Sequence, residues 1–162
     1  MTDDLETWRA LVDVYQAVLH DVVRALETEA GIDSGMYSVL AYLQRADPPG
    51  RLPLAELQRL MYPRYSQPGL SRLVQRMETA GLLERRTDPL DGRATTVYAT
   101  RGGRTRFDRA HDTYSAAVHE HFLAHLDAAE RSRLASDLGH VLSRRGVMAR
   151  RPRQDSNLRP RH

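Results

Sequence analysis

The sequence predicts a mainly α-helical fold with one small β-hairpin set between long helices. Apolar residues recur at three- and four-residue steps along most of the 162-residue chain, which is the period of an amphipathic helix. The run from Ala94 to about Thr100 is instead β-branched and aromatic, and it follows a turn of Asp, Pro and Gly that is typical of a hairpin. A chain of this length is long enough to form a proper core.

The first predicted helix runs from about Asp4 to Ala30 and ends near Gly31. Its apolar stripe is made of Leu5, Trp8, Leu11, Val12, Tyr15, Val18, Leu19, Val22 and Leu26. A helix this long usually depends on packing against a bundle or a second chain. We therefore expect this stripe to pack against other helices.

Two shorter helices are predicted next. The first is expected to have Ser34 as its N-cap and to end before the Asp47–Gly50 turn. Its inward residues are expected to be Met36, Val39, Leu40 and Leu43. The other spans Pro53 to about Met61, and its buried residues are expected to be Leu54, Leu57 and Leu60.

The fourth predicted helix has two faces of different chemistry. Ser66 is a good N-cap, Pro68 is tolerated in the first turn, and Gly81 supplies the stop. One stripe is apolar and should pack inward: Leu70, Leu73, Val74 and Met77. The opposite stripe holds only hydrogen-bonding and cationic side chains: Gln67, Ser71, Arg72, Gln75 and Arg76. These residue types contact base edges and phosphates, so the segment is predicted to be a nucleic-acid recognition helix.

A hairpin and two helices complete the predicted elements. The hairpin joins Leu83–Thr87 to Ala94–Thr100 through a turn at Asp88–Gly92. Thr100 is expected to cap a long fifth helix that continues to about Leu126. A sixth helix is expected from about Asp127 to Arg144.

The positive charge is confined to two segments. Residues 51–106 hold 11 Arg against 5 acidic residues, a net of +6, and residues 144–162 hold 7 against 1, also +6. Residues 1–50, with 3 Arg and 9 acidic residues, and 107–143, with 3 and 6, are net negative. The positive field therefore lies on the segment that contains the predicted recognition helix, as nucleic-acid binding requires.

The composition also excludes several functions. Cysteine is absent, which excludes disulfides, thiolate metal sites and thiol-based redox sensing. No nucleophile–base pair, phosphate-binding loop or carboxylate pair stands out in the sequence. We therefore expect that the protein is not an enzyme and binds no cofactor. With no signal peptide and no long apolar run, we expect a soluble cytoplasmic protein without a membrane partner.

The order of helix, turn, recognition helix and basic hairpin is that of a winged helix-turn-helix, and the chain resembles the MarR (multiple antibiotic resistance regulator) family of transcription factors. The match rests on Ser66–Arg86, on Asp91-Gly92-Arg93 in the wing and on Thr100-Arg101-Gly102-Gly103 opening the next helix. The resemblance implies a winged helix-turn-helix in residues 34–100, flanked by long dimerisation helices in residues 1–33 and 101–147. Residues 148–162 form a basic tail outside it.

The resemblance further implies a homodimer that places two recognition helices in successive major grooves of a pseudo-palindromic site in double-stranded DNA. The major-groove contacts would come from Gln67, Ser71, Arg72, Gln75 and Arg76. Arg93 at the wing tip, oriented by Asp91, would enter the adjacent minor groove. The DNA backbone would be contacted by Arg64, Arg85 and Arg86. For any of these arginines, a solvated surface position is the alternative interpretation.

MarR-like proteins commonly bind small aromatic or amphipathic anions in a cleft between the dimer helices and the winged domain. The resemblance therefore implies a repressor that such an effector releases from DNA. The candidate lining consists of Trp8, Tyr15, His20, Tyr37, Tyr62, Tyr65, His111 and Tyr114. Core packing is the alternative interpretation for each of these side chains.

Two other functions remain open. His111, His119, His121 and His125 crowd the predicted fifth helix, and the last two have the i, i+4 spacing that can share a metal. A zinc-responsive regulator of the same fold is therefore one alternative, although surface histidines explain the pattern more simply and no metal site is predicted. The other alternative is a winged helix that binds proteins, which would not need Arg93 or a cationic helix stripe.

The tail has the composition of a disordered basic arm, which suggests extra phosphate contacts. A second hypothesis concerns Asp155–Arg159, because the reverse complement of a transfer-RNA T-arm gene encodes Asp-Ser-Asn-Leu-Arg in one frame. The tail would then be translated from an adjacent transfer-RNA gene. The DNA sequence downstream of the gene decides between the two.

Overall fold

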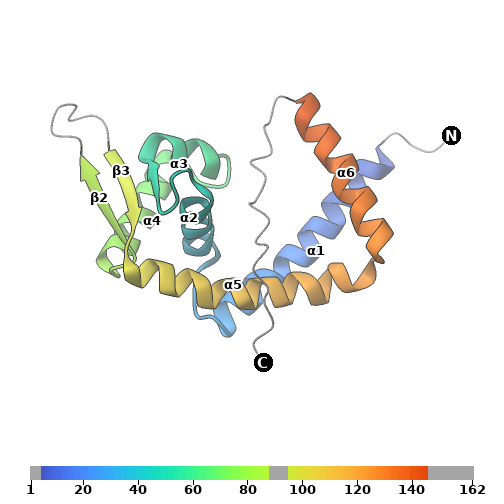
Figure 1. Cartoon of the computed structure of the whole chain (residues 1–162), viewed down its shortest axis with the longest axis horizontal. Helices are drawn as coiled ribbons and strands as arrows, with labels where there is room; N and C mark the ends of the chain where they lie inside the picture. Colours follow the sequence, from blue (N-terminus) through green and yellow to red (C-terminus); the bar gives the residue numbers. More distant parts are fainter. Residues whose placement is uncertain (1–4, 88–94, 146–162) are drawn as a thin grey trace. The chain divides into compact units, whose positions relative to one another are not determined.

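The computed structural model describes residues 5–87 and 95–145. By their contacts the residues of the chain form two compact units, which meet in sequence between Phe122 and Leu123. Within the described residues, the first unit holds five α-helices and three β-strands, and the second holds a short 3-10 helix and one α-helix (Figure 1).

In chain order the first unit contains α1 (Glu6–Thr28), α2 (Ser34–Arg45), β1 (Arg51–Pro53), α3 (Leu54–Met61), α4 (Gln67–Thr79), β2 (Leu83–Thr87), β3 (Thr95–Ala99) and α5 (Arg101–His121). The mainly helical fold with a hairpin is confirmed. Each of the five helices predicted for this part of the chain is present, with ends that shift by a few residues.

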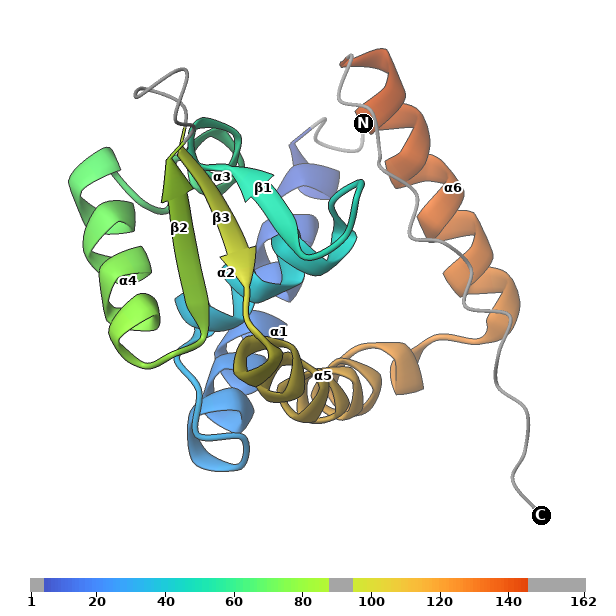
Figure 2. The same ribbon diagram turned by 60° about the vertical axis from the view of Figure 1, so that its left-hand side comes forward.

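The three strands form an antiparallel sheet in the order β1-β3-β2, and Figure 2 shows them side by side with α4 next to β2. The hairpin register runs from Leu83 opposite Ala99 to Thr87 opposite Thr95. The strand β1 was not predicted, and it adds a third strand to the sheet by pairing with β3. Three residues are too few to show the alternation that marks a strand, and only Leu52 of β1 is buried.

The core of the first unit is formed by the apolar faces of its helices and one face of the sheet. The inward stripe predicted for α4 is confirmed, because each of its residues is 1% exposed or less: Leu70, Leu73, Val74 and Met77. In α3 the expected burial of Leu60 is wrong. Leu60 is 36% exposed and Met61 is buried in its place, because Met61 follows Leu57 by four residues and so lies on the same helix face.

The start of α2 also differs from the prediction. Its N-cap is Asp33, whose carboxylate accepts hydrogen bonds from the N–H groups of Gly35, at 2.8 Å, and Met36, at 3.1 Å. Ser34 is therefore the first helical residue and not the cap. Asp and Ser are both good N-caps, so the sequence alone did not separate the two neighbouring positions.

The long fifth helix ends earlier than predicted. α5 stops at His121, and the 3-10 helix Leu123–His125 follows it in the second unit. In that unit α6 (Ala128–Arg144) begins with a capping box. The Asp127 carboxylate accepts from the Glu130 N–H and the Glu130 carboxylate accepts from the Asp127 N–H, each at 2.8 Å.

Much of the predicted apolar stripe of α1 is exposed in this single chain. Val22 and Leu26 are buried, whereas Trp8 is 63% exposed and Tyr15 60% exposed. α6 likewise leaves Val141 and Leu142 exposed. In the described part of the chain, none of the helices combines the length and the apolar character that a membrane span needs.

Candidate nucleic-acid interface

The outer face of α4 consists entirely of exposed polar and cationic side chains. Each residue predicted for the major groove is exposed: Gln67, Ser71, Arg72, Gln75 and Arg76. The opposite face of the same helix is buried in the core. The hydrogen-bonding groups therefore project from a backbone that the core holds in place, which is what base recognition requires.

The first turn of α4 follows the capping that the sequence predicts. Ser66 is extended, and its hydroxyl accepts a hydrogen bond from the Gly69 N–H at 3.3 Å. Pro68 lies in the first turn, where its missing N–H would have no helical partner. Gln67 is thus the first helical residue, and Ser71 begins the second turn.

A threonine hydroxyl joins the end of α4 to the start of α5. Thr100 is the N-cap of α5, and its Oγ1 accepts from the Gly103 N–H at 3.0 Å. The same hydroxyl donates to the carbonyl oxygen of Gly81 at 2.7 Å. Gly81 lies just past α4 with a φ of 70°, a conformation that favours glycine.

An ion pair connects the last turn of α4 to β2. The Arg85 side chain approaches the Glu78 carboxylate with its Nε at 2.9 Å and its Nη2 at 2.7 Å, and the Arg85 N–H donates to the same carboxylate at 3.1 Å. The hydrogen bond from the Arg85 side chain is the main cause that lowers the pKa of Glu78. A phosphate contact by Arg85 would therefore compete with Glu78.

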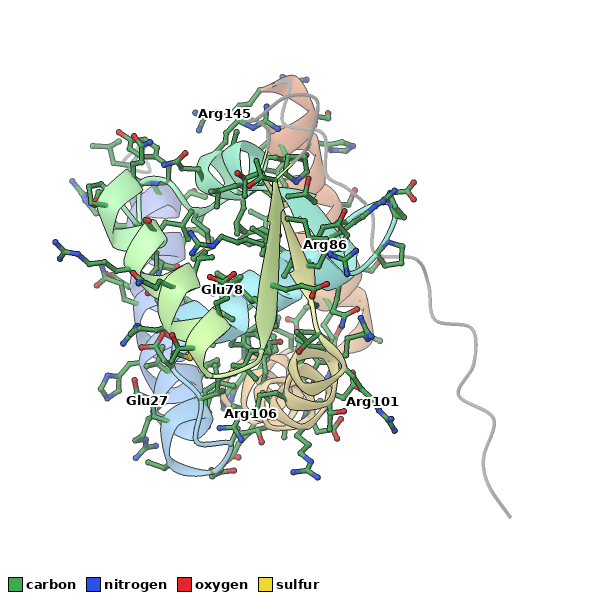
Figure 3. The ribbon with its side chains drawn as sticks, turned by 90° about the vertical axis from the view of Figure 1, so that its left-hand side faces the viewer. Glu27, Glu78, Arg86, Arg101, Arg106 and Arg145 are labelled. Atoms are coloured by element: carbon green, nitrogen blue, oxygen red, sulfur yellow. The ribbon has the colours of Figure 1, made fainter. Side chains whose placement is uncertain are left out.

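The other two arginines predicted for the DNA backbone have partners as well. Arg64 donates to the Ser34 hydroxyl at 2.8 Å, which ties the turn before α4 to the start of α2. Arg86 pairs with Glu84, and its guanidinium lies 4.6 Å from the centre of the Tyr98 ring. In Figure 3, Glu78 lies on the α4 side of the strands and Arg86 on the other side.

The wing residues Asp91 and Arg93 lie outside the described residues. The two strands that lead to them are paired up to Thr87 opposite Thr95. The hairpin of the wing is therefore confirmed up to that pair, and the roles of Asp91 and Arg93 stay predictions.

Three of the residues predicted to line an effector cleft lie together between α2 and α5. Tyr37 is 5% exposed, and its hydroxyl is 2.8 Å from Nδ1 of His111. Its ring stacks on Tyr114, with centres 4.9 Å apart, and on Phe107 at 5.7 Å. Burial raises the pKa of the Tyr37 hydroxyl. These side chains form a packed cluster, and the spacing of Phe107, His111 and Tyr114 on one helix could have pointed to Phe107 as well.

The remaining candidates for the cleft do not join this cluster. Trp8, Tyr15 and Tyr62 are exposed, as is His20, and Tyr65 packs near Gly35 at the start of α2. Two hollows on the surface of the described residues border the first turns of α5, and none of the eight predicted residues lines either one. The effector cleft therefore stays a prediction.

The histidine spacing proposed for zinc does not occur on one helix. α5 ends at His121, and His125 lies in the 3-10 helix that follows. Nδ1 of His121 instead approaches the Asp21 carboxylate of α1 at 3.7 Å. Among residues 5–87 and 95–145 no three histidine or acidic side chains are grouped as metal ligands would be.

The elements around α4 define a class of protein. α3 and α4 form a helix-turn-helix, and the β2–β3 hairpin that follows is its wing, so the first unit contains a winged helix-turn-helix. Residues 30–94 match the sequence model of the MarR family. The resemblance to the MarR family that the residue motifs indicated is therefore confirmed over residues 30–94.

Solved structures extend the likeness of the fold over most of the chain. AbsC, a MarR family transcriptional regulator from Streptomyces coelicolor, is 24% identical with a TM-score of 0.74, over 90% of this chain and 98% of AbsC. Sco3205, a MarR family transcriptional regulator from the same organism in complex with DNA, is 23% identical with a TM-score of 0.73, over 88% of both chains.

A third structure is a mutant of MarR from Escherichia coli complexed with operator DNA. It is 23% identical with a TM-score of 0.65, over 87% of this chain and 99% of that one. These likenesses establish the fold of the chain. No protein with a curated description matches the sequence.

Proposed function

We propose that this protein is a sequence-specific DNA-binding transcriptional regulator that acts as a homodimer. The observation that carries the proposal is the polar outer face of α4, which is backed by a fully buried apolar stripe. That helix lies within residues 30–94, which match the MarR family model. It also lies within residues 51–106, which carry a net charge of +6. Two structures of the same fold hold DNA, which supports the same function here.

The exposed apolar residues support the homodimer. The N-cap and the N-terminal half of α1 expose five large apolar side chains in the single chain: Leu5, Trp8, Leu11, Val14 and Tyr15. In the second unit α6 does the same with Leu138, Val141 and Leu142. Side chains of this size are rarely left in contiguous exposed rows unless a partner covers them. A second copy of the chain is the partner that the family implies.

Three further parts of the proposal rest on the family alone. The protein is a repressor that a small aromatic or amphipathic ligand releases from DNA. It is not an enzyme, since the solved structures of the same fold are transcriptional regulators. It works in the cytoplasm, as expected of a DNA-binding regulator of this family.

The major-groove assignment is tested by replacing Arg72 with alanine. If Arg72 contacts a base, Arg72→Ala should cost about 1–3 kcal/mol of binding free energy and relax the preference at one base pair of the site. Fluorescence anisotropy on operator duplexes with single-base changes measures both effects. Arg133→Ala, which removes an exposed arginine of α6, is the matched control and should change neither. Equal effects of the two changes would contradict the major-groove assignment of Arg72.

The wing assignment is tested in the same assay with Arg93→Ala. A guanidinium in a narrow minor groove is attracted by its concentrated negative potential. The change should weaken binding and remove any preference for A·T pairs in the flanks of the site, while leaving the preference for the central base pairs intact. Unchanged affinity for the operator would refute a minor-groove role.

A further inference from the structure

A hollow of about 430 Å³ opens at the base of the wing, on the surface of the first unit. Its wall is formed by the loop before β1, by β1 itself, by outward residues of β2 and β3, and by the first turn of α5. The charged and aromatic side chains in this wall are Arg51, Glu84, Arg86, Tyr98, Arg101 and Arg104. We call it the arginine hollow.

The charges around the arginine hollow do not balance. Four guanidinium groups face one carboxylate, and that carboxylate, Glu84, is already paired with Arg86. Arg104 donates its Nη1 to the neutral carbonyl oxygen of Ala99 at 2.7 Å, so its charge is not neutralised. The side chains of Arg51 and Arg101 form no hydrogen bond or ion pair with any other described residue. Among the described residues, three of the positive charges that border the hollow therefore have no paired carboxylate.

This arrangement suits an anion that carries more than one charge. Like charges that border one concave surface raise its local potential and concentrate counter-ions. Guanidinium groups bind phosphate and carboxylate oxygens through paired N–H donors, which are among the stronger hydrogen bonds in proteins. The side chains of Arg51 and Arg101 have no partner among the described residues, while the Arg86 guanidinium lies 4.6 Å from the centre of the Tyr98 ring.

The position of the hollow favours a small molecule over DNA. Figure 3 shows Arg86 and Arg101 on the side of the strands opposite α4. A duplex that follows the outer face of α4 would therefore leave Arg101 uncovered, whereas Arg86, next to the wing, is shared with the predicted backbone contacts. The hollow also lies apart from the Tyr37 cluster, because no residue of that cluster lines it.

We propose that the arginine hollow binds a small, multiply charged anion of the phosphate or polycarboxylate class. Arg51 and Arg101 supply donors that have no other partner among the described residues, and Arg104 adds a third positive charge while it donates to Ala99. The site is distinct from the DNA-binding residues proposed above, with the exception of Arg86, which borders the hollow and is also a candidate for the DNA backbone.

Isothermal titration calorimetry of the full chain tests the proposal, with inorganic pyrophosphate and citrate as probes at constant ionic strength. One of the two probes should bind saturably with one site per chain. Arg51→Gln and Arg101→Gln should each weaken that binding by about tenfold or more, because each removes charged hydrogen bonds. Arg133→Gln removes the same charge from α6 and should leave the affinity unchanged.

Three results would overturn the proposal. The first is that neither probe binds the wild-type chain, and the second is that Arg133→Gln weakens binding as much as Arg51→Gln does. The third is that Arg51→Gln and Arg101→Gln weaken operator binding in anion-free buffer as strongly as Arg72→Ala, which would make the hollow a DNA-backbone contact. Circular dichroism spectra and melting curves that match the wild type show that each variant is folded.

Discussion

Gly103 lies where α5 passes closest to the chain that leaves the recognition helix. A Cβ atom at this position would lie 2.1 Å from the carbonyl oxygen of Leu82, which belongs to the backbone and has little room to shift. Gly103→Ala should therefore lower the free energy of unfolding by about 1–3 kcal/mol, as overpacking does in other cores. Urea denaturation followed by circular dichroism measures the change.

Gly139 provides the control with the opposite sign. It lies inside α6, where an added Cβ would meet no other group within 4 Å. Gly139→Ala should raise the free energy of unfolding by up to about 1 kcal/mol, because alanine favours the helix more than glycine does. If both changes destabilised the chain equally, the steric explanation for Gly103 would be wrong.

The ion pair between Glu78 and Arg85 makes stability depend on pH. Arg85 lowers the pKa of Glu78 below its ordinary value of 4.5. The carboxylate's contribution is therefore complete above that value and is lost as the pH falls through the lower pKa of the folded state. Glu78→Gln should lower Tm at pH 7, and its difference from the wild type should shrink below about pH 4.5. A difference that stays constant down to pH 3 would contradict this account.

At the scale of elements, the sequence pattern predicted the features of α4 that depend on residues close together in the chain. The two faces of α4 follow from the three- and four-residue spacing of Leu70, Leu73, Val74 and Met77, and all four are buried. Its cap at Ser66 and its stop at Gly81 follow from side-chain and backbone preferences that act within one turn. Both kinds of signal are present in a single short segment.

The features that the sequence did not predict depend on contacts between distant segments. β1 is a strand because Leu52 lies opposite Val97, 45 positions later in the chain. Arg85 binds Glu78 because the turn after α4 folds β2 back along the helix, although both residues alone look like ordinary surface charges. In the candidate site the sequence predicted which residues of α4 are exposed, whereas the partners of Arg64, Arg85 and Arg86 needed the fold.

At the scale of the whole molecule, the exposed stripe of α1 is expected to lie in a homodimer interface. Tyr15→Arg places a charge in that stripe and should shift the protein towards monomer at micromolar concentration, because a buried unpaired charge is costly. Operator affinity should fall with it, since two recognition helices bind one site. Sedimentation velocity over a range of concentrations measures the shift.

Ala17→Arg is the matched control for this prediction. Ala17 is exposed and lies roughly 200° around the helix from Tyr15, so its side chain points away from Trp8, Leu11 and Tyr15. The variant should keep the oligomeric state of the wild type. Dimers that survive Tyr15→Arg unchanged would show that this stripe is not the interface.

The hydrogen bond from the Thr100 hydroxyl couples movements of α5 to the end of α4. The hydroxyl donates a hydrogen bond to the carbonyl oxygen of Gly81, so the end of α4 and the start of α5 are joined at this point. α5 is roughly 30 Å long at 1.5 Å per residue, so a sideways displacement of about 5 Å at its His121 end equals a tilt of about 10° at this point. Any reorientation of α5 must therefore rotate the end of α4 with it, or break the hydrogen bonds from Thr100 to the carbonyl groups of Gly81 and Leu82.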